Sequence, residues 1–121
     1  MTCVLIVDDS PIIRKVARHV LQSHGYDIVE AVDGQAGLDL CAMAMPDAIL
    51  VDSNMPMMDG CEFLRRLRAM PGGGEPRVVF CTTENEVGHL ARAMYAGANS
   101  YMMKPFDRDM ILAKLGEAGV P

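Results

Sequence analysis

The 121-residue sequence has no apolar run long enough to cross a membrane. Its opening segment, residues 1–7, lacks a basic start and is too short for a secretory signal. We therefore expect a cytoplasmic protein without membrane insertion. A basic cluster is also missing and the net charge is −5, so the sequence lacks the electrostatic footprint of a protein that binds DNA or RNA directly.

The cysteines lack the C-x-x-C and Cys/His spacings that bind metal ions or carry redox chemistry. We expect reduced thiols that act as small buried hydrophobic side chains, namely Cys3, Cys41, Cys61 and Cys81. Internal repeats and low-complexity segments are absent as well. The length and the 50% hydrophobic composition thus predict a single domain that spans residues 1–121.

The sequence does contain short apolar segments that alternate with longer amphipathic ones. Residues 4–7, 48–52, 77–81 and 100–103 predict buried strands, and the partly alternating residues 27–32 predict an edge strand. Each is followed by a segment with apolar residues at helical spacing. This alternation predicts an α/β fold in which a parallel sheet is covered by helices on both faces, with right-handed crossovers.

Capping residues mark where these helices are expected to begin. The expected starts are Ser10–Pro11, Asp33–Gly34, Asp59 with Glu62 in a capping box, Asn85 or Glu86, and Asp107. Helical spacing places Ile13, Val16, Val20 and Leu21 on the inner face of the first helix. The basic residues expected to face water on the first and third helices are Arg14, Lys15, Arg18, Arg65, Arg66 and Arg68.

Polar side chains follow four of the expected strands. They are Asp8 and Asp9, Asp52, Thr82 and Lys104. Parallel strands bring their carboxyl ends to one edge of the sheet, where ligands bind in open α/β folds. Two carboxylates ~4 Å apart repel each other by about 4 kcal/mol at an effective dielectric of about 20, so a cation is expected among them. Mg²⁺ accepts carboxylates and shares its remaining positions with water and phosphate.

Asp52 is the candidate nucleophile at this edge, because an Asp carboxylate can accept a phosphoryl group and form an acyl phosphate. An ionised carboxylate needs no general base, so the lack of a histidine at the strand ends is no objection. Lys104 supplies a fixed positive charge, and the Thr82 hydroxyl suits a hydrogen bond to an added phosphoryl oxygen. Together these residues predict a site for a phosphoryl group.

The same residues, in this order, resemble the receiver domain of bacterial response regulators. The motifs are Asp8-Asp9, Asp52 within Val-Asp-Ser-Asn-Met-Pro-x-Met-Asp-Gly, Thr82, and Lys104-Pro105-Phe106. The resemblance spans essentially the whole chain. It implies a CheY-like, flavodoxin-like fold with five parallel strands in the order 2-1-3-4-5 and five flanking helices. It also implies a cis peptide bond between Lys104 and Pro105.

The resemblance further implies a mechanism. Asp52 would take a phosphoryl group from a sensor histidine kinase or a histidine phosphotransfer protein. Asp9, Asp52 and the main-chain carbonyl of Asn54 would hold Mg²⁺, with Asp8 acting through a metal-bound water. Thr82 would move toward the phosphoryl group and Tyr101 would swing inward. Asn54 and Glu84 would tune the lifetime of the phosphoryl group.

The resemblance also implies an output. The expected target surface is the fourth helix, fifth strand and fifth helix, including His89, Arg92, Tyr101 and Lys114. The chain is expected to be a stand-alone receiver without an output domain, a monomer or weak phosphorylation-dependent dimer, and no enzyme beyond its own phosphorylation and dephosphorylation. Its downstream target protein would be a flagellar motor, as in chemotaxis, a phosphorelay component or a kinase. We hypothesise that Arg14, Lys15 and Arg18 meet the acidic side of the phosphodonor.

Two other classes of protein use a similar sheet. An aspartyl-phosphate phosphohydrolase normally has a second Asp two residues after its nucleophile, and here that residue is Asn54. A flavin or nucleotide carrier needs a phosphate-cradling turn after the first strand, where Asp8 and Asp9 would repel a phosphate. Turnover of a simple phosphate ester would indicate the first class, and a visible chromophore the second.

Overall fold

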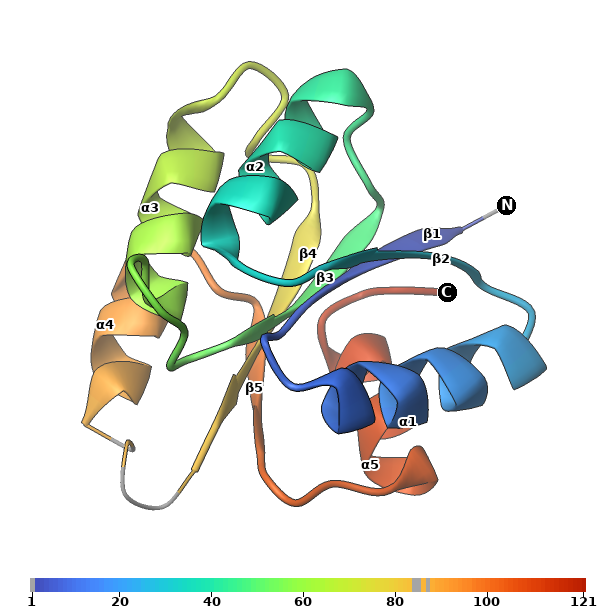
Figure 1. Ribbon diagram of the computed structural model, residues 1–121. Helices are drawn as coiled ribbons and strands as arrows, with labels where there is room; N and C mark the ends of the chain where they lie inside the picture. The colour runs from blue at the N-terminus through green and yellow to red at the C-terminus, as the bar shows by residue number, and fades with distance from the viewer. Residues whose placement is uncertain (1, 84–85, 87) are drawn as a thin grey trace.

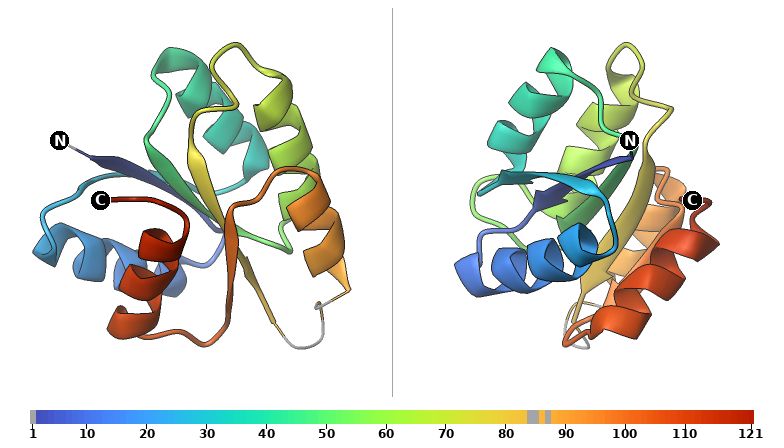
Figure 2. Two further views of the ribbon diagram at one scale, coloured as in Figure 1. Left: turned by 180° about the vertical axis from the view of Figure 1, so that it is seen from behind. Right: turned by 90° about the vertical axis from the view of Figure 1, so that its right-hand side faces the viewer.

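Parallel strands form a central sheet with helices on both sides (Figures 1 and 2). The computed structural model describes residues 2–83, 86 and 88–121. The strands are β1 (Cys3–Val7), β2 (Asp27–Ala31), β3 (Ala48–Asp52), β4 (Arg77–Thr82) and β5 (Ser100–Met103), and the helices are α1 (Pro11–Ser23), α2 (Gly34–Met43), α3 (Gly60–Ala69), α4 (His89–Tyr95) and α5 (Arg108–Glu117). The five-stranded sheet has the order β2-β1-β3-β4-β5. The predicted fold class and strand order are confirmed.

Alternate residues of the inner strands enter two separate hydrophobic cores. Leu5 and Val7 of β1 pack toward α2, α3 and α4, in a core that includes the fully buried Phe63 and Leu64. Val4 and Ile6 face the opposite way, toward α1 and α5. Because strand side chains alternate between the two faces, a strand buried on both sides must be apolar throughout. This explains the continuous apolar runs in the sequence.

Side-chain caps begin four of the helices where the sequence predicted them. The oxygens of Ser10, Asp33, Asp59 and Asp107 accept hydrogen bonds from the N–H groups three residues later. The other bond expected of the capping box, from the Asp59 N–H to the Glu62 side chain, is wrong, however. The Glu62 carboxylate turns to Arg65 and Arg66, each 2.6 Å away, since two guanidinium partners compete with one backbone N–H.

Three side chains point differently from the prediction. Val16 is exposed, and Ala17 occupies the buried position on α1 instead. Arg14 and Arg68 are largely covered rather than directed into water. Arg68 donates hydrogen bonds to the carbonyls of Gly73, Pro76 and Gly97 and to the Asn99 side chain. Long basic side chains can bury their stems and still satisfy their donors, which helical periodicity alone does not reveal.

Helix α4 begins later than predicted. Its first residue is His89, preceded by Gly88, which provides no side-chain cap. The expected start at Asn85 and the expected role of Glu84 fall outside the described residues. Glu86 belongs to a turn in which its N–H donates to the Thr83 carbonyl at 3.0 Å. This turn places Glu86 ahead of the helix.

The cysteines are free thiols, as predicted, with Cys41, Cys61 and Cys81 buried and Cys3 only partly so. Burial raises the pKa of the Cys81 thiol to about 12, so this neighbour of the strand-end carboxylates stays protonated at neutral pH. Among the described residues, no helix has the length and apolarity that a bilayer crossing requires.

Gly60 allows the chain after β3 to turn back against the sheet. A Cβ at this position would contact the Asp52 carbonyl and would lie 2.8 Å from Cε1 of Phe80. The Gly60 N–H also donates to the Ser53 carbonyl at 3.0 Å. The segment that carries Asp52 therefore depends on the absence of a side chain at residue 60.

We predict that Gly60→Ala lowers the free energy of unfolding by about 1–3 kcal/mol, because the added methyl group overpacks this turn. Urea denaturation monitored by circular dichroism measures the change. Gly116→Ala is the control, since a Cβ there meets open space on α5. That control is expected to gain roughly 0.5–1 kcal/mol from the higher helix propensity of Ala. Equal stability of Gly60→Ala and wild type would contradict the role of Gly60.

Candidate functional site

The strand register brings the predicted polar residues together at one edge of the sheet. Val7 pairs with Val51, which places Asp8 beside Asp52. Thr82 pairs with Met103, which places Lys104 just beyond it. Strand β1 lies between β2 and β3, so the direction of winding reverses at β1. Ligands in such sheets bind outside the carboxyl ends of the strands at this reversal.

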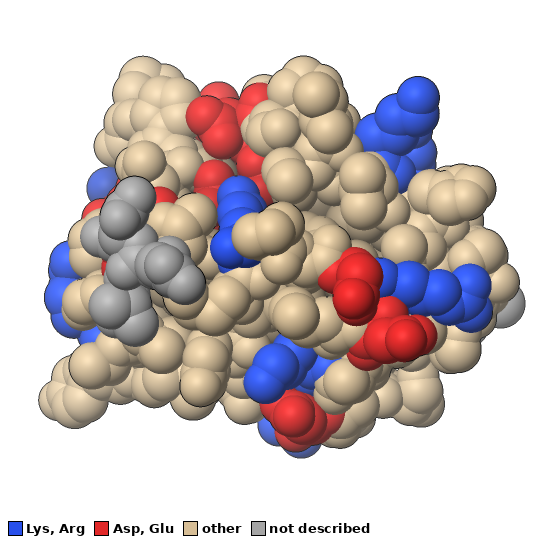
Figure 3. All heavy atoms as spheres, turned by 90° about the horizontal axis from the view of Figure 1, so that it is seen from below, with Lys and Arg blue, Asp and Glu red and all other residues tan. Residues whose placement is uncertain are grey.

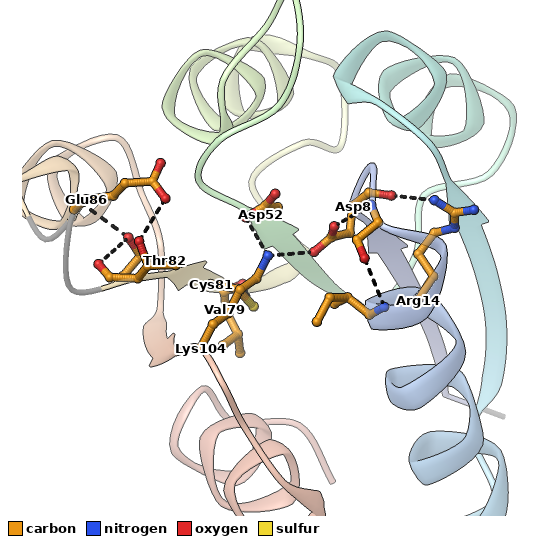
Figure 4. A network of polar contacts seen from close by, with 11 residues as sticks. Asp8, Arg14, Asp52, Val79, Cys81, Thr82, Glu86 and Lys104 are labelled. Atoms are coloured by element: carbon orange, nitrogen blue, oxygen red, sulfur yellow. Dashed lines mark hydrogen bonds and ion pairs between the residues drawn. The ribbon is translucent and has the colours of Figure 1, made fainter.

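Lys104 connects the acidic residues across the sheet. Its Nζ lies 3.0 Å from Oδ2 of Asp8 and 2.8 Å from Oδ1 of Asp52 (Figure 4). The side chains of Asp8, Asp52 and Lys104 are only 4%, 8% and 16% exposed. The view onto this edge shows acidic side chains gathered around a shallow recess with a basic side chain directly beside them (Figure 3). The predicted convergence of Asp8, Asp52 and Lys104 is thus present.

The third carboxylate, Asp9, joins the same group from the exposed side. Carboxylate oxygens of Asp8, Asp9 and Asp52 all lie within 4.8 Å of one another. One lysine charge faces three carboxylates, which leaves a net negative cluster made of hard oxygen donors. Such a donor set fits a divalent cation of the Mg²⁺ type.

Burial and neighbouring charges act on the Asp52 carboxyl in opposite directions. Burial raises its pKa, and repulsion from Asp8 adds to that rise. The hydrogen bond from Lys104 and the backbone N–H of Asn54 lower it, but the net pKa still lies above the ordinary value. For Lys104, burial lowers the pKa, while the hydrogen bonds to Asp52 and Asp8 raise it by more. The two groups stabilise each other as an ion pair.

Thr82 and Tyr101 lie near the site but do not point into it. Thr82 is fully buried, and its hydroxyl donates to the carbonyls of Thr83 and Glu86, 3.4 and 3.3 Å away, on the side away from Asp52 (Figure 4). The Tyr101 side chain is exposed, and Nζ of Lys114 lies 5.1 Å from its ring centre. The peptide bond between Lys104 and Pro105 is cis, as predicted.

The structure adds contacts that the sequence interpretation missed. The Ser10 N–H donates to Oδ1 of Asp8 at 2.9 Å, and Nη1 of Arg14 donates to the Asp8 carbonyl at 2.7 Å. Arg14 was expected on the outer face of its helix. One signal was available: Glu30 has the opposite charge and lies on the strand that follows this helix, where it can pair with Arg14.

Comparisons with known proteins show which family this chain is similar to. Residues 4–116 match the sequence model of the family described as response regulator receiver domain. The response regulator MprA of Mycolicibacterium vanbaalenii is 36% identical over 112 residues, which cover 93% of this chain and 48% of that protein. MprA of Mycobacterium avium is 35% identical over the same length and with the same coverage. The chain thus spans about half the length of these curated relatives.

Solved structures give the same result for the fold. The chemotaxis protein CheY4 of Vibrio cholerae superposes with a TM-score of 0.92 and 34% identity, covering 98% of both chains. A CheY-like receiver domain protein from Methanospirillum hungatei gives 0.88 and 26% identity, covering 97% of this chain and 92% of that one. These matches favour the receiver interpretation over the phosphohydrolase and the flavin carrier.

We predict that Asp52→Asn is more stable than wild type at pH 7 in metal-free buffer. The raised pKa means that the folded state binds a proton at Asp52 more tightly than the unfolded state does. The ionised carboxylate therefore costs stability as pH rises through that pKa. Thermal unfolding across pH measures this, and the difference should vanish below about pH 4, where an ordinary Asp is protonated in both states.

Making Asp52→Asn in a Lys104→Met variant tests whether the ammonium sets the size of this effect. Without the ammonium, the pKa of Asp52 should rise further, so Asp52→Asn should stabilise Lys104→Met more than it stabilises wild type. Greater stability of wild type than of Asp52→Asn at pH 7, with chelator present, would contradict the balance of forces described for this carboxyl.

Proposed function

Because this chain belongs to the response regulator receiver domain family, we propose that Asp52 accepts a phosphoryl group from a phosphohistidine on a sensor histidine kinase or a histidine phosphotransfer protein. The observation that carries this proposal is the placement of the Asp52 carboxylate, 2.8 Å from the Lys104 ammonium and beside two further carboxylates. Asp8 also contacts the Lys104 ammonium, at 3.0 Å, but its other carboxylate oxygen accepts the Ser10 N–H.

The proposed phosphoryl transfer to Asp52 needs no general base. A carboxylate oxygen of Asp52 forms the new O–P bond while the N–P bond of the donor phosphohistidine breaks, and the electron pair returns to the imidazole. Lys104 lies where it can neutralise charge on the phosphoryl oxygens. The protein thus contributes position and charge. Its chemistry is limited to its own phosphorylation and dephosphorylation.

We infer that Mg²⁺ is the cation of this site, held by Asp9, Asp52 and the Asn54 carbonyl, with Asp8 acting through water. The support is the cluster of three carboxylates within 4.8 Å, whose charge a single lysine only partly compensates. When bound, the ion supplies charge neutralisation between the carboxylates and the phosphoryl oxygens. Asn54 is exposed and lies in the loop between the end of β3 and Gly60.

We propose that movements of Thr82 and Tyr101 transmit the phosphorylation of Asp52 to the protein surface. The Thr82 hydroxyl can leave the carbonyls of Thr83 and Glu86 for a phosphoryl oxygen, which frees space for Tyr101 to turn inward. The surface of α4, β5 and α5 would then present a new face to a downstream protein. The proposed output is direct binding of this kind, in a chemotaxis pathway or a phosphorelay.

Phosphorylation at Asp52 predicts a specific mass change. With acetyl phosphate and Mg²⁺, intact-mass spectrometry should show one added phosphoryl group on wild type and none on Asp52→Asn. The matched control is Asp59→Asn, because Asn also caps a helix and α3 should stay intact. Equal modification of Asp52→Asn and wild type would assign the acceptor to another residue, and no modification of wild type would overturn the proposed function.

Inward movement of Tyr101 predicts a change in its local environment. The chain contains three tyrosines, Tyr26, Tyr95 and Tyr101, so fluorotyrosine labelling gives a small set of ¹⁹F resonances that single Phe substitutions can assign. Beryllofluoride with Mg²⁺ should shift the Tyr101 resonance and leave Tyr26 unchanged, since Tyr26 bonds to the Pro121 carbonyl far from the site. The shift should be lost in Asp52→Asn. An unmoved Tyr101 signal in a beryllofluoride-bound protein would refute the switch.

A further inference from the structure

Arg14 links three segments of the fold at the acidic site. It projects from the first turns of α1, and its side chain is only 15% exposed. Nη1 donates to the Asp8 carbonyl at 2.7 Å, and Nε lies 3.3 Å from Oε1 of Glu30 on β2. Figure 4 shows Arg14 and Lys104 approaching Asp8 from opposite sides. One guanidinium thus joins the start of α1, the edge strand β2 and the turn that carries the acidic pair, Asp8 and Asp9.

Asp8 is held through its backbone as well as its carboxylate. Its N–H donates to the Ala31 carbonyl at 3.1 Å, which extends the pairing of β1 with β2. Its carboxylate accepts from Ser10 and Lys104. Arg14 holds the remaining polar group, the carbonyl, and this carbonyl belongs to the peptide unit that joins Asp8 to Asp9. Holding one end of a planar peptide fixes the other end as well.

Asp9 depends on that peptide more than Asp8 does. It is exposed, so packing does little to place its carboxylate, and the backbone that carries it sets its direction. Its oxygens nevertheless lie within 4.8 Å of those of the buried Asp8 and Asp52. An exposed carboxylate in so close a group of like charges requires a rigid backbone, because repulsion favours its movement into solvent.

Glu30 keeps Arg14 in place. Its two oxygens bind different arginines: Oε1 faces Nε of Arg14, and Oε2 lies 2.6 Å from Nη1 of Arg18. Glu30 pairs in register with Ile6, one strand away from the site, on the face covered by α1. Arg18 therefore shares the ion pair with Arg14 but has no contact with the Asp8 backbone among the described hydrogen bonds. This arrangement offers a control that separates the ion pair from the carbonyl contact.

We propose that Arg14 is a positioning residue of the acidic site, which acts by holding the Asp8 carbonyl so that Asp8 and Asp9 are placed in advance for a divalent cation. The inference rests on the proposed function, in which these carboxylates bind Mg²⁺. It also revises the hypothesis that Arg14 forms part of an outward basic face, since its side chain is largely covered and its Nε and Nη1 bind partners within the fold. Residues that orient metal ligands typically change metal affinity by about 10–100-fold when replaced.

The test is the affinity of the unphosphorylated protein for Mg²⁺, measured by calorimetric titration of wild type, Arg14→Met, Arg14→Lys and Arg18→Met. Arg14→Met should bind Mg²⁺ about tenfold more weakly, whereas Arg18→Met should match wild type although it loses the same ion-pair partner. Arg14→Lys should recover part of the affinity, because an ammonium can reach the carbonyl but cannot also hold Glu30 through a rigid fork.

Amide hydrogen exchange without metal provides a second readout. The Ser10 N–H donates to Asp8, so it reports on the order of this turn. Its exchange should speed up in Arg14→Met and stay unchanged in Arg18→Met, at a temperature where both variants are fully folded. A merely structural role would lower the stability of both variants without singling out this turn.

The outcomes are distinct. Equal Mg²⁺ affinity of Arg14→Met and wild type, or equal weakening in Arg18→Met, overturns the inference and leaves the proposed function standing. Failure of wild type to bind Mg²⁺ overturns both. If Arg14→Met does not fold, Glu30→Gln decides, because it keeps the guanidinium and removes the charge that orients it: weaker Mg²⁺ binding supports the inference, and unchanged binding overturns it.

Discussion

The contact of one ammonium group with two buried carboxylates is the interaction on which this site depends. Lys104 follows β5, and Asp8 and Asp52 belong to the ends of β1 and β3, so a single charge ties together three strands that are distant in sequence. Removing the cation that compensates buried carboxylates typically costs about 3–5 kcal/mol, because the carboxylates are left without compensation. The Lys104 ammonium therefore stabilises this edge of the sheet.

Even with Lys104 in contact, the negative charge of the site is not fully compensated. Burial still raises the pKa of Asp52, and the cluster retains more negative than positive charge. This residual imbalance suits the cation and the phosphoryl group that we propose for the site. This imbalance does not disrupt the two hydrophobic cores, because the charged groups lie at or just beyond the strand ends and belong to neither core. Stability and chemistry are thus assigned to different parts of each strand.

Support for the acidic pair comes from two sides with different roles. Lys104 compensates the charge of the carboxylates, whereas Arg14 holds the backbone between Asp8 and Asp9. On the opposite flank, the Thr82 hydroxyl is bound to carbonyls of the following turn and stays out of the site. One flank of Asp52 is therefore preorganised and the other is held in an alternative arrangement. Such an asymmetry suits the proposed function, in which Thr82 moves after the phosphoryl group has bound.

The sequence alone determined the elements that obey local rules. Apolar runs located the strands, and Ser10 and Asp59 marked helix starts, because capping and strand burial depend on residues close in the chain. Polar residues at strand ends sufficed to place Asp8, Asp52 and Lys104 together. Only the tertiary structure decided that Arg14 turns inward, that Val16 is exposed and that the Thr82 hydroxyl bonds away from Asp52. These outcomes depend on partners from other elements, such as Glu30 for Arg14, and periodicity along one helix carries no information about them.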